Sequence, residues 1–290
     1  MKRAIGIDVG GTSIVGAVVG TDGTYTDTSR IPTPRTGAAD VCAAVGQLAR
    51  DLRLRDPDVA DTVGVCLPGI IDQRTGTGIT SANLGWANSP LRDLLEAASG
   101  HPVLIAQDVR SGAMAEARWG IGLDSFYYLA LGTGLGAATI LDGRPHSINP
   151  LAGEIGQYLV PDPDTGDLVR LEELVSATGL IARARRFGLI GPEAGAREVI
   201  ELGTATSRRL VEDSMRILGQ ALAPALFMLG PLPVVLGGGP SGGGSLLTEP
   251  LADELARQLR PLGAQVPVLT AKLGDKSQMI GAAALVFTEK

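Results

Sequence analysis

The sequence predicts an α/β protein with two related domains. Residues 4–19 contain two runs rich in β-branched residues on either side of Gly10 and Gly11, a pattern typical of a β-hairpin with a tight glycine turn. Residues 126–141 repeat this order of strand, glycine turn and strand. A repeat at such a long spacing indicates related domains rather than a short-period solenoid. A chain of 290 residues is long enough to give each domain its own core.

The remaining elements follow in order from hydrophobic spacing and turn residues. A strand is expected over 25–34, and a helix capped by Asp40 follows, because its apolar residues recur at helical spacing. A strand is expected at 62–67, shortly before Gly69, and another at 103–106, shortly before Asp108. A hairpin at 75–80 and a helix at 90–99 are expected between these two strands. The second half is expected to contain helices at 171–187, 197–202, 207–229, 248–262 (capped by Thr248) and 276–287, and strands at 234–236 and 266–269.

Composition and charge exclude several classes of protein. Hydrophobic residues make up 44% of the chain and glycine occurs 40 times, which indicates a globular protein with many tight turns. The net charge is −6 and the basic residues of segment 183–186 form the longest basic cluster, so we expect no nucleic-acid partner. Residues 217–248 carry no charge, but Pro224, Pro231 and Pro233 interrupt them, so we expect a cytoplasmic protein without a membrane span. Cys42 and Cys66 are expected to be small core residues, and two histidines are too few for a histidine metal site.

The first glycine turn has the features of a phosphate site. Glycine accepts positive φ and has no side chain, so the N–H groups of Gly10, Gly11 and Thr12 can surround a phosphate. Asp8 would repel that phosphate unless a cation lay between them, and hydrated Mg²⁺ near Asp8 fits this requirement. The alternative is an ordinary hairpin that carries an aspartate in its turn.

Three carboxylates are candidates for the chemistry. Asp108 follows a strand and precedes a helix, and ligands of open α/β sheets bind at the carboxyl ends of strands. Phosphoryl transfer needs a carboxylate that accepts the proton of the attacking hydroxyl, a role that suits Asp108, although capping the following helix is an equal alternative. Glu154 could be a solvated loop residue, and Glu172 could owe its place to the helix dipole.

Two phosphate-type turns facing one another across a cleft are the arrangement of the actin-like ATPase folds. We therefore expect an α/β, two-domain actin-like ATPase (ribonuclease H-like) fold with a cleft between the domains. Over nearly its whole length, the chain resembles the ROK family of sugar kinases. The resemblance rests on the order and spacing of the motifs at residues 8–12, 68–69, 83–86, 108, 132–136, 152–156, 171–172 and 236–239.

The resemblance implies a role for each of these motifs. An N-terminal phosphate- and sugar-binding domain would comprise residues 1–109 and 276–290, and a C-terminal nucleotide-binding domain residues 110–275. Asp108 would be the catalytic base. The implied ATP-binding residues are Asp8, Gly10, Gly11, Thr12, Gly132, Thr133, Gly134, Gly237, Gly238 and Gly239, and the implied sugar-binding residues are Gly69, Asn83, Gln107, Asp108, Glu154, Gln157 and Glu172.

The chain also departs from the family pattern. Gln157 stands where the family has a histidine, and residues 159–168 contain none of the cysteines of the family zinc motif, so we expect no structural zinc. Asp162, Asp164 and Asp167 could form a hard-cation loop, but an acidic turn is the simpler interpretation. Gln107 replaces an asparagine, and Arg110 replaces a small polar residue.

These observations lead to one main hypothesis and several alternatives. The main hypothesis is an ATP- and Mg²⁺-dependent kinase for the 6-hydroxyl of a hexose or amino-hexose. Kanosamine is among the candidates, because Asp108, Glu154 and Glu172 lack the histidine and zinc that would offset their charges, and negative charge favours a sugar with an ammonium group. Arg110 would oppose this preference if it entered the pocket. The alternatives are a zinc-free glucokinase, a non-catalytic sugar-binding or regulatory protein, and a chaperone- or actin-like ATPase. A homodimer is expected from the family resemblance.

Overall fold

The chain divides into two units. Residues 2–26, 28–81 and 83–288 are described by the computed structural model, except for the side chains of residues 240 and 241. Unit 1 comprises Met1–Asp124, Gly143–Ala152 and Asp275–Lys290, and unit 2 comprises Ser125–Asp142 and Gly153–Gly274. The domain boundary that the sequence suggests, after residue 109, falls inside helix α3 (Asp108–Trp119), whereas unit 1 contains this helix completely.

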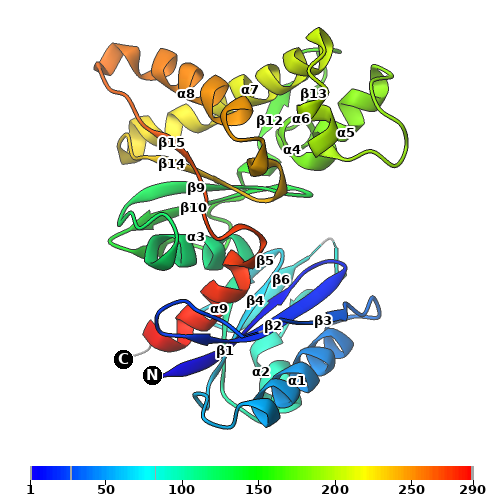
Figure 1. Cartoon of the computed structure of the whole chain (residues 1–290), viewed down its shortest axis with the longest axis vertical. Helices are drawn as coiled ribbons and strands as arrows, with labels where there is room; N and C mark the ends of the chain where they lie inside the picture. The colour runs from blue at the N-terminus through cyan, green and yellow to red at the C-terminus, as the bar shows by residue number, and fades with distance from the viewer. Residues whose placement is uncertain (1, 27, 82, 289–290) are drawn as a thin grey trace. The chain divides into compact units, whose positions relative to one another are not determined.

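A five-stranded sheet forms the centre of unit 1 (Figure 1). Its strands lie in the order β3 (Ser29–Pro32), β2 (Ser13–Gly20), β1 (Arg3–Val9), β4 (Val63–Leu67) and β8 (Val103–Gln107). The antiparallel pairing of β1 with β2 confirms the predicted hairpin at Gly10 and Gly11. Strands β1, β4 and β8 are parallel, so their carboxyl ends, which carry Asp8, Gly69 and Asp108, meet at one edge of the sheet.

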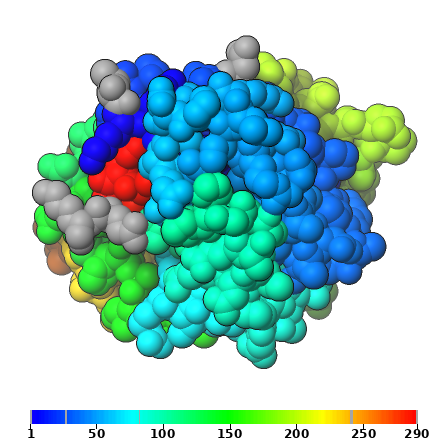
Figure 2. Space-filling model, turned by 90° about the horizontal axis from the view of Figure 1, so that it is seen from below, coloured from blue at the N-terminus to red at the C-terminus, as the bar shows by residue number. Residues whose placement is uncertain are grey.

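Helices cover both faces of this sheet. On one face, α1 (Ala38–Arg55) packs beside α2 (Leu91–Ser99) so closely that a Cβ on Gly46 would lie 2.5 Å from the carbonyl carbon of Ala98. Figure 2 looks onto this side of the unit, with α1 in light blue next to the turquoise of α2. On the other face, α9 (Ser277–Thr288) lies directly on the strands, since a Cβ on Gly6 or Gly64 would overlap a carbonyl oxygen of that helix.

Smaller elements complete unit 1. Strands β5 (Ile70–Asp72), β6 (Thr77–Thr80) and β7 (Ala87–Ser89) form a separate three-stranded sheet, and β11 (Arg144–His146) lies in the short segment that returns to the unit. Two sequence predictions need correction here. The hairpin expected at 75–80 has its first strand earlier, at β5, and α1 begins before Asp40, with Gly37 at its N-cap.

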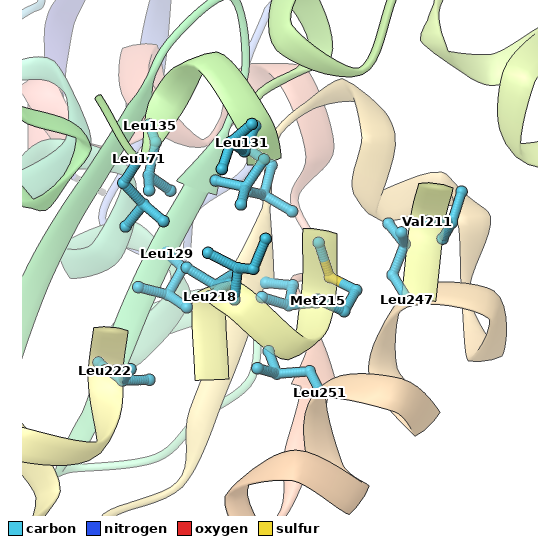
Figure 3. Close-up of a cluster of buried hydrophobic side chains, with 14 of the residues drawn as sticks. Leu129, Leu131, Leu135, Leu171, Val211, Met215, Leu218, Leu222, Leu247 and Leu251 are labelled. Carbon is cyan, nitrogen blue, oxygen red and sulfur yellow. The ribbon is translucent and has the colours of Figure 1, made fainter. Parts of the chain in front are cut away.

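Unit 2 repeats the strand order of unit 1. Strands β10 (Leu135–Leu141), β9 (Phe126–Leu131), β14 (Val234–Gly237) and β15 (Val268–Thr270) take the places of β2, β1, β4 and β8, with β9 and β10 antiparallel and the others parallel. This correspondence confirms the duplication that the sequence predicts. Helices α7 (Ala205–Leu229) and α8 (Ser245–Leu259) supply leucines that meet those of β9 in the core (Figure 3).

The helix expected at 171–187 is broken in two. It forms α4 (Glu172–Val175) and α5 (Ala177–Arg186), and the Ser176 hydroxyl caps α5 by accepting a hydrogen bond from Gly179 N at 3.1 Å. The helix predicted to start at Thr248 begins earlier, at Ser245. The other helix and strands of the unit are α6 (Ala196–Glu201), β12 (Leu159–Pro161) and β13 (Leu168–Arg170). Its short 3₁₀ turns are η1 (Ile155–Gln157), η2 (Gly239–Gly243) and η3 (Arg260–Leu262), and η4 (Gly274–Lys276) lies where the chain passes from unit 2 to unit 1.

In the ranges that the structure describes, no helix is both long enough and apolar enough to cross a membrane.

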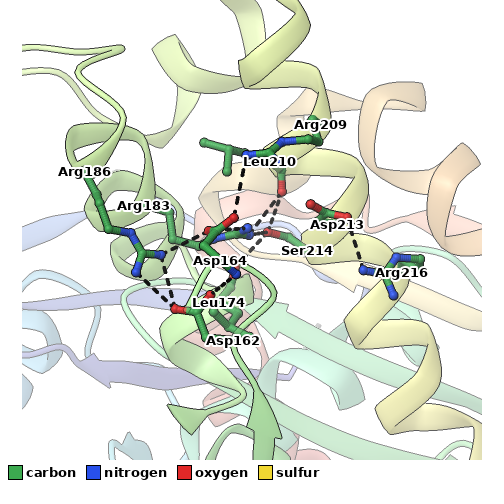
Figure 4. Close-up of polar contacts among 10 residues, drawn as sticks. All are labelled: Asp162, Asp164, Leu174, Arg183, Arg186, Arg209, Leu210, Asp213, Ser214 and Arg216. Atoms are coloured by element: carbon green, nitrogen blue, oxygen red, sulfur yellow. Dashed lines mark hydrogen bonds and ion pairs between the residues drawn. The ribbon is translucent and has the colours of Figure 1, made fainter. Parts of the chain in front are cut away.

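Two aspartates of the β12–β13 turn form ion pairs with arginines from the helices (Figure 4). Asp164 Oδ2 accepts hydrogen bonds from Nε and Nη2 of Arg183 at 3.1 and 2.9 Å, and Arg186 bridges Asp164 and Asp162 at 3.1 Å to each. Arg209 of α7 lies 3.6 Å from the other oxygen of Asp164. Burial raises the pKa of Asp162, but the Asp164 N–H and Arg186 outweigh it, so this pKa is lowered overall. Asp162 and Asp164 therefore hold the turn through arginines, and we name these five residues the Asp–Arg cluster.

Replacing Asp164 by asparagine should lower the free energy of unfolding by roughly 3 kcal/mol, because it leaves the charge of Arg183 without its buried partner. The side chains of Arg183 and Asp164 are only 2% and 8% exposed. Glu201→Gln is the control, since it removes an ion pair to Arg197 whose side chains are 60% and 85% exposed, and such a pair contributes less than about 1 kcal/mol. Urea denaturation followed by circular dichroism measures the free energy of unfolding of both variants. Equal stability of the two variants would contradict the role of the cluster.

Candidate active site

The first glycine turn is held closed by hydrogen bonds within unit 1. Gly10 N donates to Ser13 O at 3.0 Å, and the Thr33 hydroxyl donates to Gly10 O at 2.7 Å. A Cβ placed on Gly11 would lie 3.7 Å from Asn83 Cβ. The structure thus brings Asn83, a predicted sugar-binding residue, next to the predicted phosphate turn.

Asp8 lies on the sheet face that α9 covers, and its environment perturbs its ionisation. Asp8 pairs with Cys66 of β4, whose Sγ donates to Asp8 Oδ1 at 3.2 Å. Burial raises the pKa of Asp8 from 3.8 to about 6, against the opposing effects of Cys66, Arg30 and Lys276. Burial also raises the pKa of Cys66 well above its usual value, so the thiol is a neutral donor.

These surroundings fit a hydrated magnesium ion. Burial raises the pKa of this carboxyl group even though Arg30 and Lys276 act on it, and a divalent cation would further favour its charged form. The described residues contain no group of three or more His, Cys, Asp or Glu side chains arranged to hold a metal. Mg²⁺ bound through one carboxylate, water and nucleotide phosphates does not need such a group. Asp8 is the residue that would hold it.

Asp108 does not cap the helix that it begins. The N-cap of α3 is Gln107, whose side-chain oxygen accepts a hydrogen bond from Arg110 N at 3.0 Å. Asp108 Oδ1 accepts one from Val109 N at 2.8 Å. Both Asp8 and Asp108 raise the pKa of Cys66, after the larger effect of burial, so the two carboxylates flank this thiol. The capping alternative therefore applies to Gln107, and the amide oxygen of this predicted sugar-binding residue is committed to the helix.

Arg110 fixes the segment that leads to Glu154. Its guanidinium is buried and Nη2 donates to the carbonyls of Pro150 and Ala152, both at 2.9 Å. A further contact of 3.4 Å joins Nη1 to Gln73 Oε1. The charge of Arg110 is thus used to bind backbone carbonyls of unit 1.

A second group of predicted residues comes together in unit 2. A Cβ on Gly134 would lie 2.9 Å from Glu172 Oε2, so this carboxylate adjoins the second glycine turn. Gln157 Nε2 donates to Glu172 Oε1 at 3.1 Å, and Arg170 forms an ion pair with the same oxygen at 3.0 Å. Glu154 is half-buried and begins the turn η1, where its carbonyl accepts Gln157 N at 3.1 Å. Glu172, one of the three acids counted in the sequence, therefore has a cationic partner.

The glycines after β14 are required for different reasons. A side chain on Gly237 would overlap the ring of Tyr128, and Gly238 has a φ of +92° that favours glycine. Gly239, like Gly132 in the second turn, has no positive φ, and a Cβ there would find none of the described atoms within 4 Å. Neither backbone conformation nor packing explains these two glycines. Open space on that side leaves the backbone accessible to a ligand.

A model of the ROK family matches residues 4–289 of the sequence. The chain belongs to the ROK family. This ROK protein is 30% identical to a glucokinase from Halalkalibacterium halodurans, over 97% of this chain and 94% of that relative. It is 31% identical to an N-acetyl-D-glucosamine kinase from Citrobacter koseri, over 98% and 99% of the two chains. A solved ROK family glucokinase from Streptomyces griseus, in complex with glucose and AMPPNP, is 28% identical, with a TM-score of 0.81 and 98% of each chain covered.

The predicted family and the actin-like ATPase fold are confirmed by these similarities. Sequence reasoning nevertheless missed three residues beside Asp8 in this ROK protein. Cys66 was expected only as a core residue, and Arg30 and Lys276 were not considered. Cys66 is recognisable only from the strand register, because it is 58 positions from Asp8.

Replacing Asp8 by asparagine should stabilise the protein when nucleotide and magnesium are absent. The folded state binds the Asp8 proton more tightly than the unfolded state, so wild-type stability falls as the pH rises from about 4 to 6 and stays lowered above that range. Because the pKa rises from 3.8 to about 6, the free energy of unfolding of Asp8→Asn should exceed that of wild type by roughly 1–3 kcal/mol near pH 7.5 and should match it below about pH 4. Asp58→Asn, which removes an exposed carboxylate, controls for the loss of one negative charge. Urea denaturation in the presence of EDTA, near pH 7.5 and below about pH 4, measures the stability of each variant relative to wild type. An Asp8→Asn variant that is less stable than wild type at pH 7.5 would contradict the prediction.

Proposed function

We propose that this ROK protein is an ATP-dependent kinase that phosphorylates the 6-hydroxyl of a hexose or amino-hexose, with Asp108 as the general base. The observation that carries this proposal is the placement of Asp8 and Asp108 at the carboxyl ends of parallel strands, on either side of the neutral thiol of Cys66. One carboxylate can then hold a cation while the other accepts a proton. The relatives named as sugar kinases, and the relative bound to glucose and the ATP analogue AMPPNP, support the same reaction.

Each predicted residue has a role in this reaction. In unit 1, Asp108 accepts the proton of the attacking hydroxyl, while Gln107 provides the N-cap of α3. Asp8 would hold hydrated Mg²⁺, and this ion would offset charge on the phosphates. The phosphate-binding residues are Gly10, Gly11, Thr12, Gly132, Thr133 and Gly134, the adenosine-binding residues are Gly237, Gly238 and Gly239, and the further sugar-binding residues are Gly69, Asn83, Gln107, Glu154, Gln157 and Glu172.

Charge pairing in unit 2 favours a neutral sugar over an amino sugar. A site prefers an ammonium group only if the negative charges of its carboxylates are not already paired with cations. Arg170 Nη1 lies 3.0 Å from Glu172 Oε1 and offsets the charge of that carboxylate. Arg110 does not decide between the two, because its guanidinium binds backbone carbonyls. Glucose is therefore the leading substrate. Kanosamine is the second candidate, supported by Asp108 and Glu154. The homodimer and the absence of structural zinc remain predictions from the sequence.

The Asp108→Asn variant should lose activity while still binding ATP. Asparagine keeps the shape of the side chain but cannot accept the proton, so kcat should fall by roughly 10²–10⁴. Calorimetric titration with ATP should give a dissociation constant within about twofold of wild type. A variant that keeps most of its turnover would show that Asp108 is not the base.

A comparison of sugars under identical conditions tests the substrate. We expect kcat/KM for glucose to exceed those for kanosamine, glucosamine, mannose, N-acetylmannosamine and N-acetylglucosamine, measured by ADP release with MgATP. If kcat/KM for kanosamine exceeds that for glucose tenfold, the negative charges of Asp108 and Glu154 decide the preference although Glu172 is paired. If no sugar stimulates ADP release, the kinase assignment itself is wrong.

A further inference from the structure

Arg30 stands in the same row of side chains as Asp8. Asp8 pairs with Val15 of β2, and Val15 pairs with Arg30 of β3. Directly paired residues of antiparallel strands point to the same face, and neighbouring strands lie about 4.8 Å apart. The Cα atoms of Arg30 and Asp8 are therefore roughly 10 Å apart, across two strand spacings of the sheet (Figure 1).

The guanidinium of Arg30 is held at the mouth of the first glycine turn. Its Nη1 donates to the Ser13 hydroxyl at 2.6 Å, and Ser13 directly follows the Gly10–Gly11–Thr12 turn. One hydrogen bond uses only one of the five N–H donors of a guanidinium. Within the described ranges, no carboxylate forms an ion pair with Arg30. Gly10 N, one of the three N–H groups expected to face a phosphate, donates to Ser13 O instead. Arg30 is thus a cation with unused donors beside a turn whose Gly11 and Thr12 N–H groups could bind a phosphate.

The other cation near Asp8 is already paired. Lys276 Nζ forms an ion pair with Asp275 at 2.8 Å. The positive charges of Arg30 and Lys276 both act on the carboxyl group of Asp8, which confirms that they share its surroundings. Arg30 is therefore the arginine available to an anion at this turn.

We propose that Arg30 binds a phosphate oxygen of the nucleotide at the first glycine turn. This inference rests on the proposed kinase function and adds a residue that the motifs do not include. A guanidinium carries its charge at every physiological pH, and its fork of donors matches two phosphate oxygens. Arg30 would offset the repulsion between Asp8 and the phosphate, together with a cation held by Asp8.

The experiment compares Arg30→Ala with Arg55→Ala. Arg55 of α1 is a matched control, because it is exposed and its Nη1 donates to a hydroxyl of the same strand, Ser29 Oγ, at 2.9 Å. We expect Arg30→Ala to weaken MgATP binding about tenfold or more, and to reduce the salt dependence of that binding, while glucose binding and the unfolding midpoint match those of Arg55→Ala. Arg30→Lys, which keeps the charge without the fork, should lie between Arg30→Ala and wild type.

The outcomes separate this inference from the function on which it rests. If wild-type protein binds MgATP and phosphorylates a sugar, but Arg30→Ala and Arg55→Ala bind MgATP equally, Arg30 has no phosphate role and the kinase assignment stands. If wild-type protein binds no nucleotide, both are overturned. If Arg30→Ala loses MgATP and glucose binding together with stability, its role is to support the β2–β3 pairing, and the phosphate role is wrong.

Discussion

The backbone contact between α9 and the central sheet is the constraint on which unit 1 depends. Glycine at positions 6 and 64 lets carbonyl groups of α9 approach the strands, and Gly281 of the helix meets the Ser111 carbonyl of α3. A Cβ at any of these positions would overlap the opposing backbone. Because α9 packs this closely, the Gln278 carbonyl lies 3.4 Å from Cys66 Sγ, next to Asp8. Burial on this face of the sheet is the main cause of the raised pKa of Asp8.

The two carboxylates of unit 1 have different surroundings. Asp8 is held by a thiol that burial keeps neutral, so it keeps its own charge for a cation. Asp108 follows β8, which is two strands away from β1 in the sheet. Gln107 is the N-cap of α3, a role that an aspartate at a helix start ordinarily has. Asp108 Oδ1 accepts a hydrogen bond from Val109 N, so its side chain contacts the first turn of α3. The two carboxylates thus lie at one sheet edge with different hydrogen-bond partners.

In unit 2, partners that lie far along the chain decide what each charge can do. The acids of the β12–β13 turn, considered as cation ligands from the sequence, bind Arg183 and Arg186 of α5 instead. Glu172 adjoins the second glycine turn, yet Arg170 shares its carboxylate. Counting acids in the sequence overstated the negative charge at Glu172. In a folded chain, the charge that a ligand meets is the charge left after such pairing.

The sequence by itself determined the glycine turns, the strands that end at Asp8 and Asp108, the duplicated architecture and the family, because these depend on local residue patterns and their order. It misplaced elements where a single side chain decides, as at Ser176, which breaks one expected helix into two. Only the tertiary structure decided that Cys66 and Arg30 share a row with Asp8, that Arg110 binds the carbonyls of Pro150 and Ala152, and that Glu172 is paired. These contacts come from strand register and from the closing of loops onto distant helices. Shifting a strand register by one residue would turn Cys66 or Arg30 to the opposite face of the sheet, and no local pattern records that choice.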